Sequence, residues 1–352
     1  MYTELRDFGL TPFFLQQLSA GQLDKGCLGR VTEVQRSLVR VFDGCSELAL
    51  PLTASLQEAE PEDRPTVGDW VVVDGQRSRV ERVLDRKSVF RRVAAGEKAQ
   101  IQLVAANIDI LFVVTSCNEE FKESRLERYL ALAAEAGVVP VVVLTKTDLS
   151  EDPSAYVDRA RSVQAGIPVV SINAMDRSTF DDLVAWIEPA CTVALVGSSG
   201  VGKSTILNSL IGADVAATAE IREDDKKGRH TTSNRALYRL PGGGLVIDVP
   251  GMRELKVAEV DEALSTVFAE IESLAQHCRF ADCRHESEPG CAVRRAIKKG
   301  QIEERRLINY LKLIRENQRH SVSLAEARTK GRNLAKQVKQ AVALKKGLKG
   351  ER

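Results

Sequence analysis

The pattern of hydrophobic and polar positions changes twice along the chain. The first 20 residues predict a short helix or a poorly ordered leader. Five strand-like runs then follow one another, separated by turn-forming residues, at 29–34, 37–42, 47–52, 68–74 and 79–85. Short strands at this spacing predict a small closed β-barrel, and an OB-fold and an SH3-like barrel both fit the pattern. Three aromatic residues of this region are candidates for contact with nucleic acid, but we expect them to be packed in a hydrophobic core instead: Phe42, Trp70 and Phe90.

The central region has continuous apolar runs instead. They predict buried strands at 109–115, 138–145, 168–172, 192–197 and 244–249. Helical stretches lie between them. In the stretch 123–136, for example, Leu126, Leu130 and Ala133 fall on one helical face. Apolar strands that alternate with amphipathic helices are typical of an α/β domain with a mostly parallel sheet covered on both faces.

A glycine-rich turn follows the strand at 192–197. It reads Gly197-Ser198-Ser199-Gly200-Val201-Gly202-Lys203-Ser204-Thr205, which matches the GxxxxGK[ST] phosphate loop, and a helical stretch continues from it. Glycine lets the backbone curl so that successive amides point at phosphate oxygens. We expect Lys203 to reach the β and γ phosphates of a nucleotide and Ser204 to hold Mg²⁺. The alternative, an incidental glycine turn, is disfavoured by the order of strand, loop and helix.

Two segments downstream of this loop fit the same site. Asp248 ends the strand at 244–249, so we expect its carboxylate to approach Mg²⁺ through water and the Gly251 amide to sense the γ phosphate. His230-Thr231-Thr232 lies between the loop and Asp248 in a charged, glycine-bearing segment. This composition suits a mobile switch with a magnesium-binding threonine, and the sequence leaves open which of the two threonines it is.

A motif suited to reading a base lies upstream of the phosphate loop. The strand at 138–145 leads into Thr145-Lys146-Thr147-Asp148-Leu149, and the next strand ends in Ser171-Ile172. The Asp148 carboxylate can accept hydrogen bonds from guanine N1 and the 2-amino group, which adenine cannot supply. In a parallel sheet the ligand sits at the carboxyl ends of the strands whichever strand comes first, so a circular permutation keeps the site intact. The motif therefore predicts GTP or GDP as ligand, with the stem of Lys146 packed along the ring.

Three cysteines and one histidine gather toward the C-terminus. Cys278-x4-Cys283-x-His285-x5-Cys291 supplies four ligands within fourteen residues. This set predicts one structural, tetrahedral Zn²⁺ site with no open position for catalysis. His277 competes as a ligand, but Cys278 is better spaced. The seven cysteines of the chain are too few and too unevenly spaced for a disulfide framework.

The net charge of +1 hides an asymmetry. Residues 294–352 contain 18 Lys and Arg against 5 Asp and Glu, whereas the preceding residues contain 32 against 44. A basic tail on an acidic body indicates a polyanionic partner, although a solvated lysine-rich helix has the same composition. No apolar run is long enough for a membrane span, and charges among the first ten residues do not suit a signal peptide. We therefore expect a soluble cytoplasmic protein that binds no membrane.

With these motifs in place, the chain resembles the RsgA family of small-subunit ribosome biogenesis GTPases, known also as YjeQ or YloQ. The resemblance rests on PTVGDWVVVD (65–74), GSSGVGKST (197–205), GRHTT (228–232), DVPG (248–251) and CRFADCRHESEPGCAV (278–293). It implies GTP hydrolysis stimulated by the small (30S) ribosomal subunit and its rRNA during late maturation, by a protein that we expect to be a monomer. Its implied domains are a leader (1–22), an RNA-binding OB-fold (23–92), a circularly permuted GTPase domain (93–256), and a zinc-binding domain with a basic helical tail (257–352).

Four positions bear on how closely the chain follows the family. Thr145 cannot supply the amide contact to guanine N7 that an Asn would make there. Val249 replaces the Thr of DTPG, and Ile172 replaces the Ala after Ser171, where only the backbone amide is needed. Met252 stands where many GTPases have a glutamine that orients water, which predicts a low intrinsic rate. We expect RNA binding to reposition a polar group and raise that rate, with His230 the first candidate.

Two other functions use the same phosphate loop. In a nucleotide-gated RNA-binding module, GTP switches the affinity for RNA without significant turnover. A P-loop ATPase or small-molecule kinase accepts ATP as readily as GTP, against which Asp148 argues. The sequence leaves open the maturation step, the rRNA contacts, the strictness of guanine selectivity and the oligomeric state.

Overall fold

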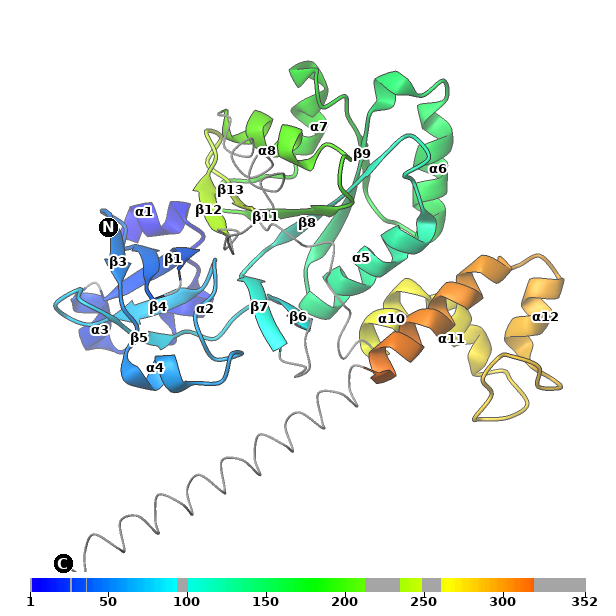
Figure 1. The fold of residues 1–352 in the computed structure, drawn as a ribbon, viewed down its shortest axis with the longest axis horizontal. Helices are drawn as coiled ribbons and strands as arrows, with labels where there is room; N and C mark the ends of the chain where they lie inside the picture. The colour runs from blue at the N-terminus through cyan, green and yellow to red at the C-terminus, as the bar shows by residue number, and fades with distance from the viewer. Residues whose placement is uncertain are drawn as a thin grey trace, which may run out of the picture.

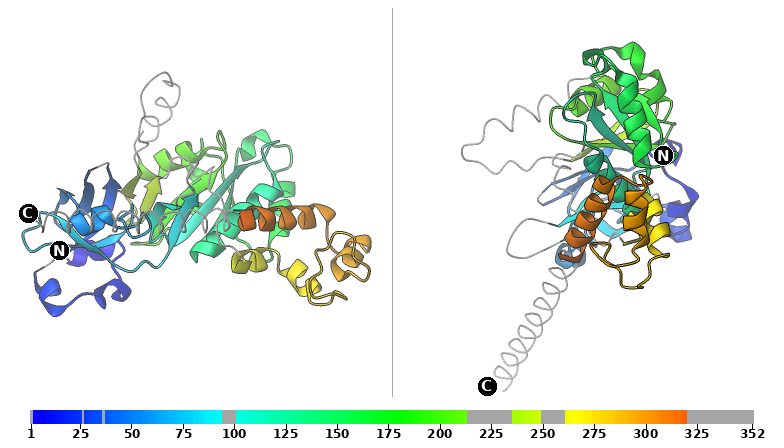
Figure 2. Two further views of the ribbon diagram at one scale, coloured as in Figure 1. Left: turned by 60° about the horizontal axis from the view of Figure 1, so that its bottom comes forward. Right: turned by 90° about the vertical axis from the view of Figure 1, so that its right-hand side faces the viewer.

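The chain forms three parts that follow one another in a row. The structure, a computed structural model, describes residues 2–25, 27–35, 37–93, 101–212, 235–248 and 261–319. An N-terminal β-unit and a C-terminal helical module lie at opposite ends of a central α/β unit (Figures 1 and 2). Among the helices of these described ranges, none is both long and apolar enough to cross a membrane.

The N-terminal β-unit is built from the five predicted strand regions. Its strands are β1 (Leu28–Val34), β2 (Val39–Phe42), β3 (Glu47–Leu50), β4 (Trp70–Val73) and β5 (Val80–Val83). They pair antiparallel in the order β3-β2-β1-β4-β5, and a parallel bridge between Leu52 and Val80 brings the chain after β3 beside β5. Trp70 and Phe90 are buried as expected, and Phe42 is half-buried.

Short helices pack on this unit. They are α1 (Tyr2–Asp7), α2 (Pro12–Leu15) and α3 (Ala20–Asp24) before β1, and α4 (Ala54–Glu58) after β3. Leu5 and Phe14 are buried in the same hydrophobic cluster as the strands. Of the two expectations for the first 20 residues, helix and poorly ordered leader, the first is therefore confirmed.

The central sheet is mostly parallel, as predicted. Its strands are β8 (Ile110–Ser116), β9 (Val139–Thr145), β10 (Val169–Ser171), β11 (Thr192–Gly197), β12 (Ala236–Arg239) and β13 (Leu245–Asp248). They lie in the order β10-β9-β8-β11-β13-β12, and β12 is antiparallel to β13. β12 also pairs with β1 through Ala236 and Glu33, so both sheets join into one of eleven strands within the described part of the chain.

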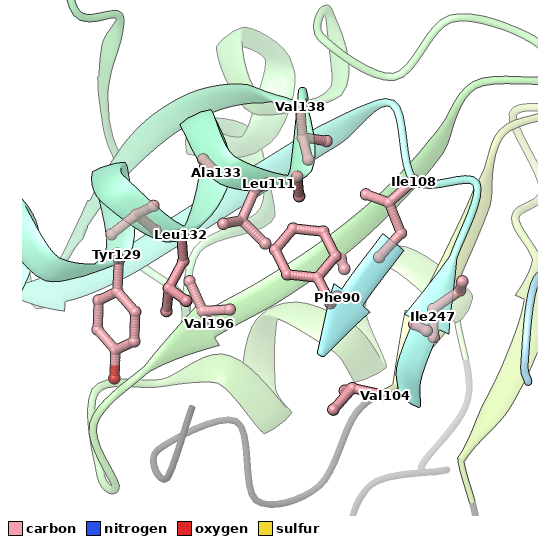
Figure 3. Packing of buried hydrophobic residues seen from close by; sticks show 14 of the residues in the cluster. Phe90, Val104, Ile108, Leu111, Tyr129, Leu132, Ala133, Val138, Val196 and Ile247 are labelled. Carbon is pink, nitrogen blue, oxygen red and sulfur yellow. The ribbon is translucent and has the colours of Figure 1, made fainter. Parts of the chain in front are cut away.

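Helices cover both faces of the central sheet. α5 (Glu123–Ala136), α6 (Pro153–Val163) and the hairpin of β6 (Val89–Val93) and β7 (Ile101–Ala106) pack on one face. α7 (Asp181–Val184) and α8 (Lys203–Ile211) pack on the other. In Figure 3, Phe90 of the hairpin and Ala133 of α5 gather around Leu111. The next residue, Phe112, belongs to the hydrophobic cluster on the opposite face. The three residues expected on the inner face of the helix at 123–136 are all buried: Leu126, Leu130 and Ala133.

The C-terminal module is helical. It contains α10 (Asp261–Val267), α11 (Ala269–Ala275), α12 (Ala292–Lys298) and a further helix at 304–319. Its core includes Phe268, Ile271, Val293 and Leu313. α10 lies against α5 of the central unit (Figure 1).

Candidate nucleotide site and cysteine–histidine cluster

The phosphate loop joins the end of β11 to the start of α8, as the sequence predicts. Gly197, Gly200 and Gly202 all have positive φ, at 148°, 73° and 96°. At Gly197 a Cβ would lie 2.2 Å from the carbonyl oxygen of Val114, so only glycine fits between β11 and β8 there. The Lys203 ammonium donates to the carbonyl of Ser198 across the loop at 2.5 Å. Ser204 and Thr205 follow in the first turn of α8 and are partly buried.

Asp248 lies at the carboxyl end of β13, the strand next to β11. Burial raises the pKa of its carboxyl to about 6, and the positive charge of Lys203 opposes that rise. A carboxylate that is buried with one cation nearby is suited to accept a second positive charge, because a cation favours the ionised form.

Thr145 joins the segment 145–149, which the sequence predicts to bind the base, to the phosphate loop. Its side chain is fully buried at the end of β9, and its hydroxyl donates to the carbonyl of Val201 at 2.6 Å. The next residue, Lys146, has a left-handed backbone with φ 57°, and a short helical turn, η1 (Thr147–Leu149), follows. Asp148 lies in this turn with its side chain exposed to solvent. Segments that are 56 residues apart in the chain thus meet at one edge of the sheet.

The structure places Ser171 and Ile172 at the end of β10, and the Ile172 amide already has a hydrogen-bond partner there. Ser171 is the last residue of β10, and the side chain of the next residue, Ile172, is fully buried in the core. The Ile172 amide donates to the carbonyl of Leu144 at 2.8 Å. Since the expected contact needs that same amide, Ile172 is not placed to make it.

The turn after β10 offers a different amide. The amide of Asn173 donates to the Thr179 hydroxyl, that of Met175 to the Asn173 side chain, and that of Asp176 to the Asn173 carbonyl. Within 172–176, all of which the structure describes, the Ala174 amide has no such partner. The Ser-Ala motif predicts the contact at the residue directly after Ser171, but the Ile172 amide still pairs with Leu144, so the first amide without such a partner comes two residues later.

Four predicted residues lie outside the described part of the chain. They are His230, Thr231, Thr232 and Gly251. The same holds for Val249 and Met252.

The predicted zinc ligands meet in the C-terminal module. Ligand atoms of Cys278, Cys283, His285 and Cys291 all lie within 4.8 Å of one another. Cys278 Sγ lies 3.9 Å from Cys291 Sγ, and His285 Nδ1 lies 3.7 and 3.4 Å from these two sulfurs. A tetrahedral zinc with ordinary bond lengths requires edges of about 3.8 Å between sulfurs and about 3.5 Å between sulfur and nitrogen. The four residues therefore fit Zn²⁺, whereas His277 is turned away, with Nδ1 2.9 Å from the carbonyl of Ser273.

Electrostatics around the cluster also suits a metal. Burial opposes ionisation of the Cys278 thiol, but hydrogen bonds from the amides of Ala292 and Val293 outweigh it, so its pKa is lowered. Burial lowers the pKa of His285 and favours the neutral imidazole, the form that binds metal. Burial and the neighbouring cysteines raise the pKa of Cys283 to about 11. A bound cation would offset that rise.

Known proteins resemble this chain along nearly its whole length. The family model for the RsgA GTPase matches residues 83–258. A protein of Vibrio vulnificus named small ribosomal subunit biogenesis GTPase RsgA 2 is 44% identical over 345 residues, covering 98% of this chain and 97% of its own. A small ribosomal subunit biogenesis GTPase RsgA of Mesorhizobium japonicum is 45% identical over 320 residues, with 90% and 91% covered.

Solved structures agree with the fold. YjeQ from Thermotoga maritima superposes with a TM-score of 0.61 at 26% identity, covering 82% of this chain and 97% of that one. YloQ, described as a circularly permuted GTPase, superposes with a TM-score of 0.57 at 24% identity, with 82% and 94% covered. The order of base-reading strand and phosphate loop, the extent of the matches and their identity lead to one conclusion: the chain belongs to the RsgA GTPase family.

Proposed function

We propose that this chain, a GTPase of the RsgA family, hydrolyses GTP while bound to the small ribosomal subunit during its late maturation. The observation that carries the proposal is the hydrogen bond from the Thr145 hydroxyl to the Val201 carbonyl. It joins the turn that carries Asp148 to the loop that carries Lys203. A nucleotide can thus have its phosphates on the loop and its base against Asp148, as a bound GTP requires.

The phosphates and their magnesium ion are held by the loop and by β13. Amides of 198–203 face the phosphates, and Lys203 leaves the Ser198 carbonyl to bind them. Ser204 would hold Mg²⁺ and Asp248 would contact it through water, and the ion would supply positive charge to the β and γ phosphates. Thr231 or Thr232 completes the site, and the Gly251 amide senses the γ phosphate.

The base lies between the turns that follow β9 and β10. Asp148 accepts from guanine N1 and the 2-amino group, and the stem of Lys146 packs along the ring. We assign the contact to guanine O6 to the Ala174 amide in place of Ile172, because it makes no other hydrogen bond within 172–176. Two exposed apolar side chains flank this edge, Leu149 at 71% and Met175 at 84% exposure, and a bound ring would cover apolar surface of this kind.

RNA contacts come from both ends of the molecule. The pairing order β3-β2-β1-β4-β5 with the bridge from Leu52 to Val80 supports an OB-fold, which binds nucleic acid on its strands. The cysteine–histidine cluster holds one structural Zn²⁺, and the basic residues beyond Arg294 neutralise rRNA phosphates. Binding should therefore weaken steeply as salt rises. Such a protein acts in the cytoplasm as a monomer.

Nucleotide turnover with and without the partner tests this proposal. Purified protein is incubated with GTP or ATP, each alone and with small ribosomal subunits, and phosphate release is followed over many turnovers. We expect slow hydrolysis of GTP that the subunits accelerate, because Met252 cannot orient water and RNA binding brings His230 into place. Equal rates with and without subunits contradict the stimulation, equal use of ATP contradicts the base assignment, and binding without turnover indicates the nucleotide-gated module.

A substitution at the base-reading residue sharpens the test. Asp148→Asn replaces two acceptor oxygens by one acceptor and one donor, so guanine should lose affinity and xanthine, which carries an oxygen at position 2, should gain it. The preference is measured by competition of GTP and xanthosine triphosphate for the site. Glu151→Gln, an exposed carboxylate three residues away, is the matched control and should leave the preference unchanged.

A further inference from the structure

Arg125 contacts the phosphate loop from a helix that carries none of the predicted motifs. It lies near the start of α5, and its Nη1 donates to the hydroxyl of Ser198. The same nitrogen lies 3.2 Å from the Glu120 carboxylate and 3.4 Å from the Glu120 carbonyl. The guanidinium is therefore held on one side by Glu120 and on the other by the loop, with 32% of the side chain exposed.

Ser198 is bound at its hydroxyl and at its carbonyl. Its hydroxyl receives Arg125 and its carbonyl receives Lys203. Lys203 must leave this carbonyl to bind phosphate, whereas the contact with Arg125 uses a different atom of Ser198 and can persist. The hydrogen bond from Arg125 to the Ser198 hydroxyl can therefore hold the first turn of the loop both with and without a bound nucleotide.

The helix that carries Arg125 is itself fixed. The next residue, Leu126, and Leu130, about one turn further along α5, are both buried in the hydrophobic cluster on this face of the sheet. A side chain that reaches the loop from a fixed helix restricts the loop, because the helix cannot follow the loop's motion.

We infer that Arg125 is a positioning residue of the nucleotide site, which holds the first turn of the phosphate loop through Ser198. This inference rests on the proposed function of the loop. Arg125 acts on the nucleotide through Ser198, and its guanidinium keeps the amides after Gly197 in the arrangement that receives phosphate. Without it the loop samples other conformations, and the bound state loses part of its preorganisation.

A double-mutant cycle tests the inference. Arg125→Ala, Ser198→Ala and the double variant are compared with the unmodified chain for the dissociation rate of a fluorescent GDP analogue and for KM and kcat of GTP hydrolysis. A hydrogen bond to a charged group, partly screened by solvent, predicts dissociation about 10-fold faster in each single variant. The double variant should be no faster than either single one, because both remove the same contact.

Two controls separate positioning from a general loss of structure. Arg159→Ala removes another arginine that pairs with α5, through Glu123 at 2.7 Å, without contact to the loop, and it should release GDP at the original rate. Arg125→Lys keeps the positive charge but loses the forked guanidinium, so its rate of GDP release should lie between those of the unmodified chain and Arg125→Ala. Melting temperatures without nucleotide should be equal for Arg125→Ala and Arg159→Ala.

The results that would overturn the inference differ from those that would overturn the proposed function. Unchanged GDP release by Arg125→Ala, or additive effects in the double variant, would overturn the inference and leave the GTPase assignment intact. Failure of the unmodified chain to bind the GDP analogue would overturn both.

Discussion

Two buried charges of opposite sign hold the flanking parts to the central unit. At the N-terminal junction the charge is Arg30 of β1, which is 1% exposed. Its guanidinium donates to three backbone carbonyls, those of Phe8 at 2.5 Å, Gly68 at 3.2 Å and Asn107 at 3.0 Å. Burial lowers its pKa to about 10.

At the C-terminal junction the charge is Glu127 of α5, whose side chain is fully buried. Its partners are the side chains of Arg305, Arg306 and Asn309. Arg306 also donates to the carbonyls of Val163 and Val267, whereas Arg305 is 35% exposed and pairs with the exposed Glu303.

The two junctions differ in whether the partners of the buried charge can turn away from it. Arg30 is bound by backbone carbonyls, which cannot move away without moving the end of α1 or the starts of β4 and β8, and its own strand β1 also pairs with β12. Glu127 is bound by side chains, one of which reaches solvent. We therefore expect the N-terminal junction to be rigid and insensitive to salt, and the C-terminal junction to adjust when its module binds a partner.

Metal removal should have the largest effect and should act on one end only. Zinc-dependent modules lose about 10 kcal/mol of apparent folding free energy without metal. A chelator should therefore abolish hydrogen-exchange protection in α11 and α12 and leave β1 and β4 protected. Cys283→Ser should act like the chelator, and Cys45→Ser, at an exposed cysteine far from the cluster, should not. Equal protection of α12 with and without chelator would show that no metal supports the module.

Replacement of Arg30 should be the costliest single substitution at a junction. Arg30→Met removes the donor of the Phe8 and Asn107 carbonyls and one of the two donors of the Gly68 carbonyl, at a combined cost of about 4 kcal/mol of unfolding free energy. Denaturant unfolding measures the loss. Arg40→Met, at an arginine of β2 that is 45% exposed, should cost less than about 1 kcal/mol. A loss at Arg30 no larger than at Arg40 would contradict the rigid junction.

Much of the central unit could be predicted because its sequence signals are local. The strands at 110–116 and 192–197 and the helix at 123–136 follow from runs and periods of apolar residues. The phosphate loop and the cysteine–histidine cluster are also local, since a few neighbouring residues fix each geometry. These signals need no knowledge of distant contacts.

What the sequence could not give depends on contacts between distant segments. The sequence predicts the base contact at the Ile172 amide, but that amide pairs with the carbonyl of Leu144, and no local feature of Ser171-Ile172 reveals this pairing. Arg125 carries no motif, and only the fold brings it to Ser198. The buried Arg30 is an ordinary polar residue of a strand until its carbonyl partners, 22 to 77 residues away, surround it.

Replacement of Glu127 should cost less than replacement of Arg30. Glu127→Gln removes the charge that Arg305 and Arg306 share, but Arg305 can turn to solvent and Arg306 keeps Glu270 at 2.5 Å and two carbonyls. We expect a loss of about 2 kcal/mol of unfolding free energy, confined to the C-terminal module. Hydrogen exchange should rise in α10 and stay constant in β1. A cost equal to that of Arg30→Met would remove the distinction between the junctions.

Removal of an exposed ion pair should change the unfolding free energy least, and by the same amount at the two junctions. Arg239 pairs with Asp7 at 2.9 Å beside the N-terminal junction, and Arg128 pairs with Glu316 at 2.8 Å beside the C-terminal one. Both pairs are partly exposed, so Arg239→Ala and Arg128→Ala should each cost about 0.5 kcal/mol, and that cost should shrink at high salt because counterions screen both pairs alike. Thermal melting at low and high salt measures it. A cost above about 2 kcal/mol for either variant would mean that surface pairing, and not the buried charge, holds that end of the molecule.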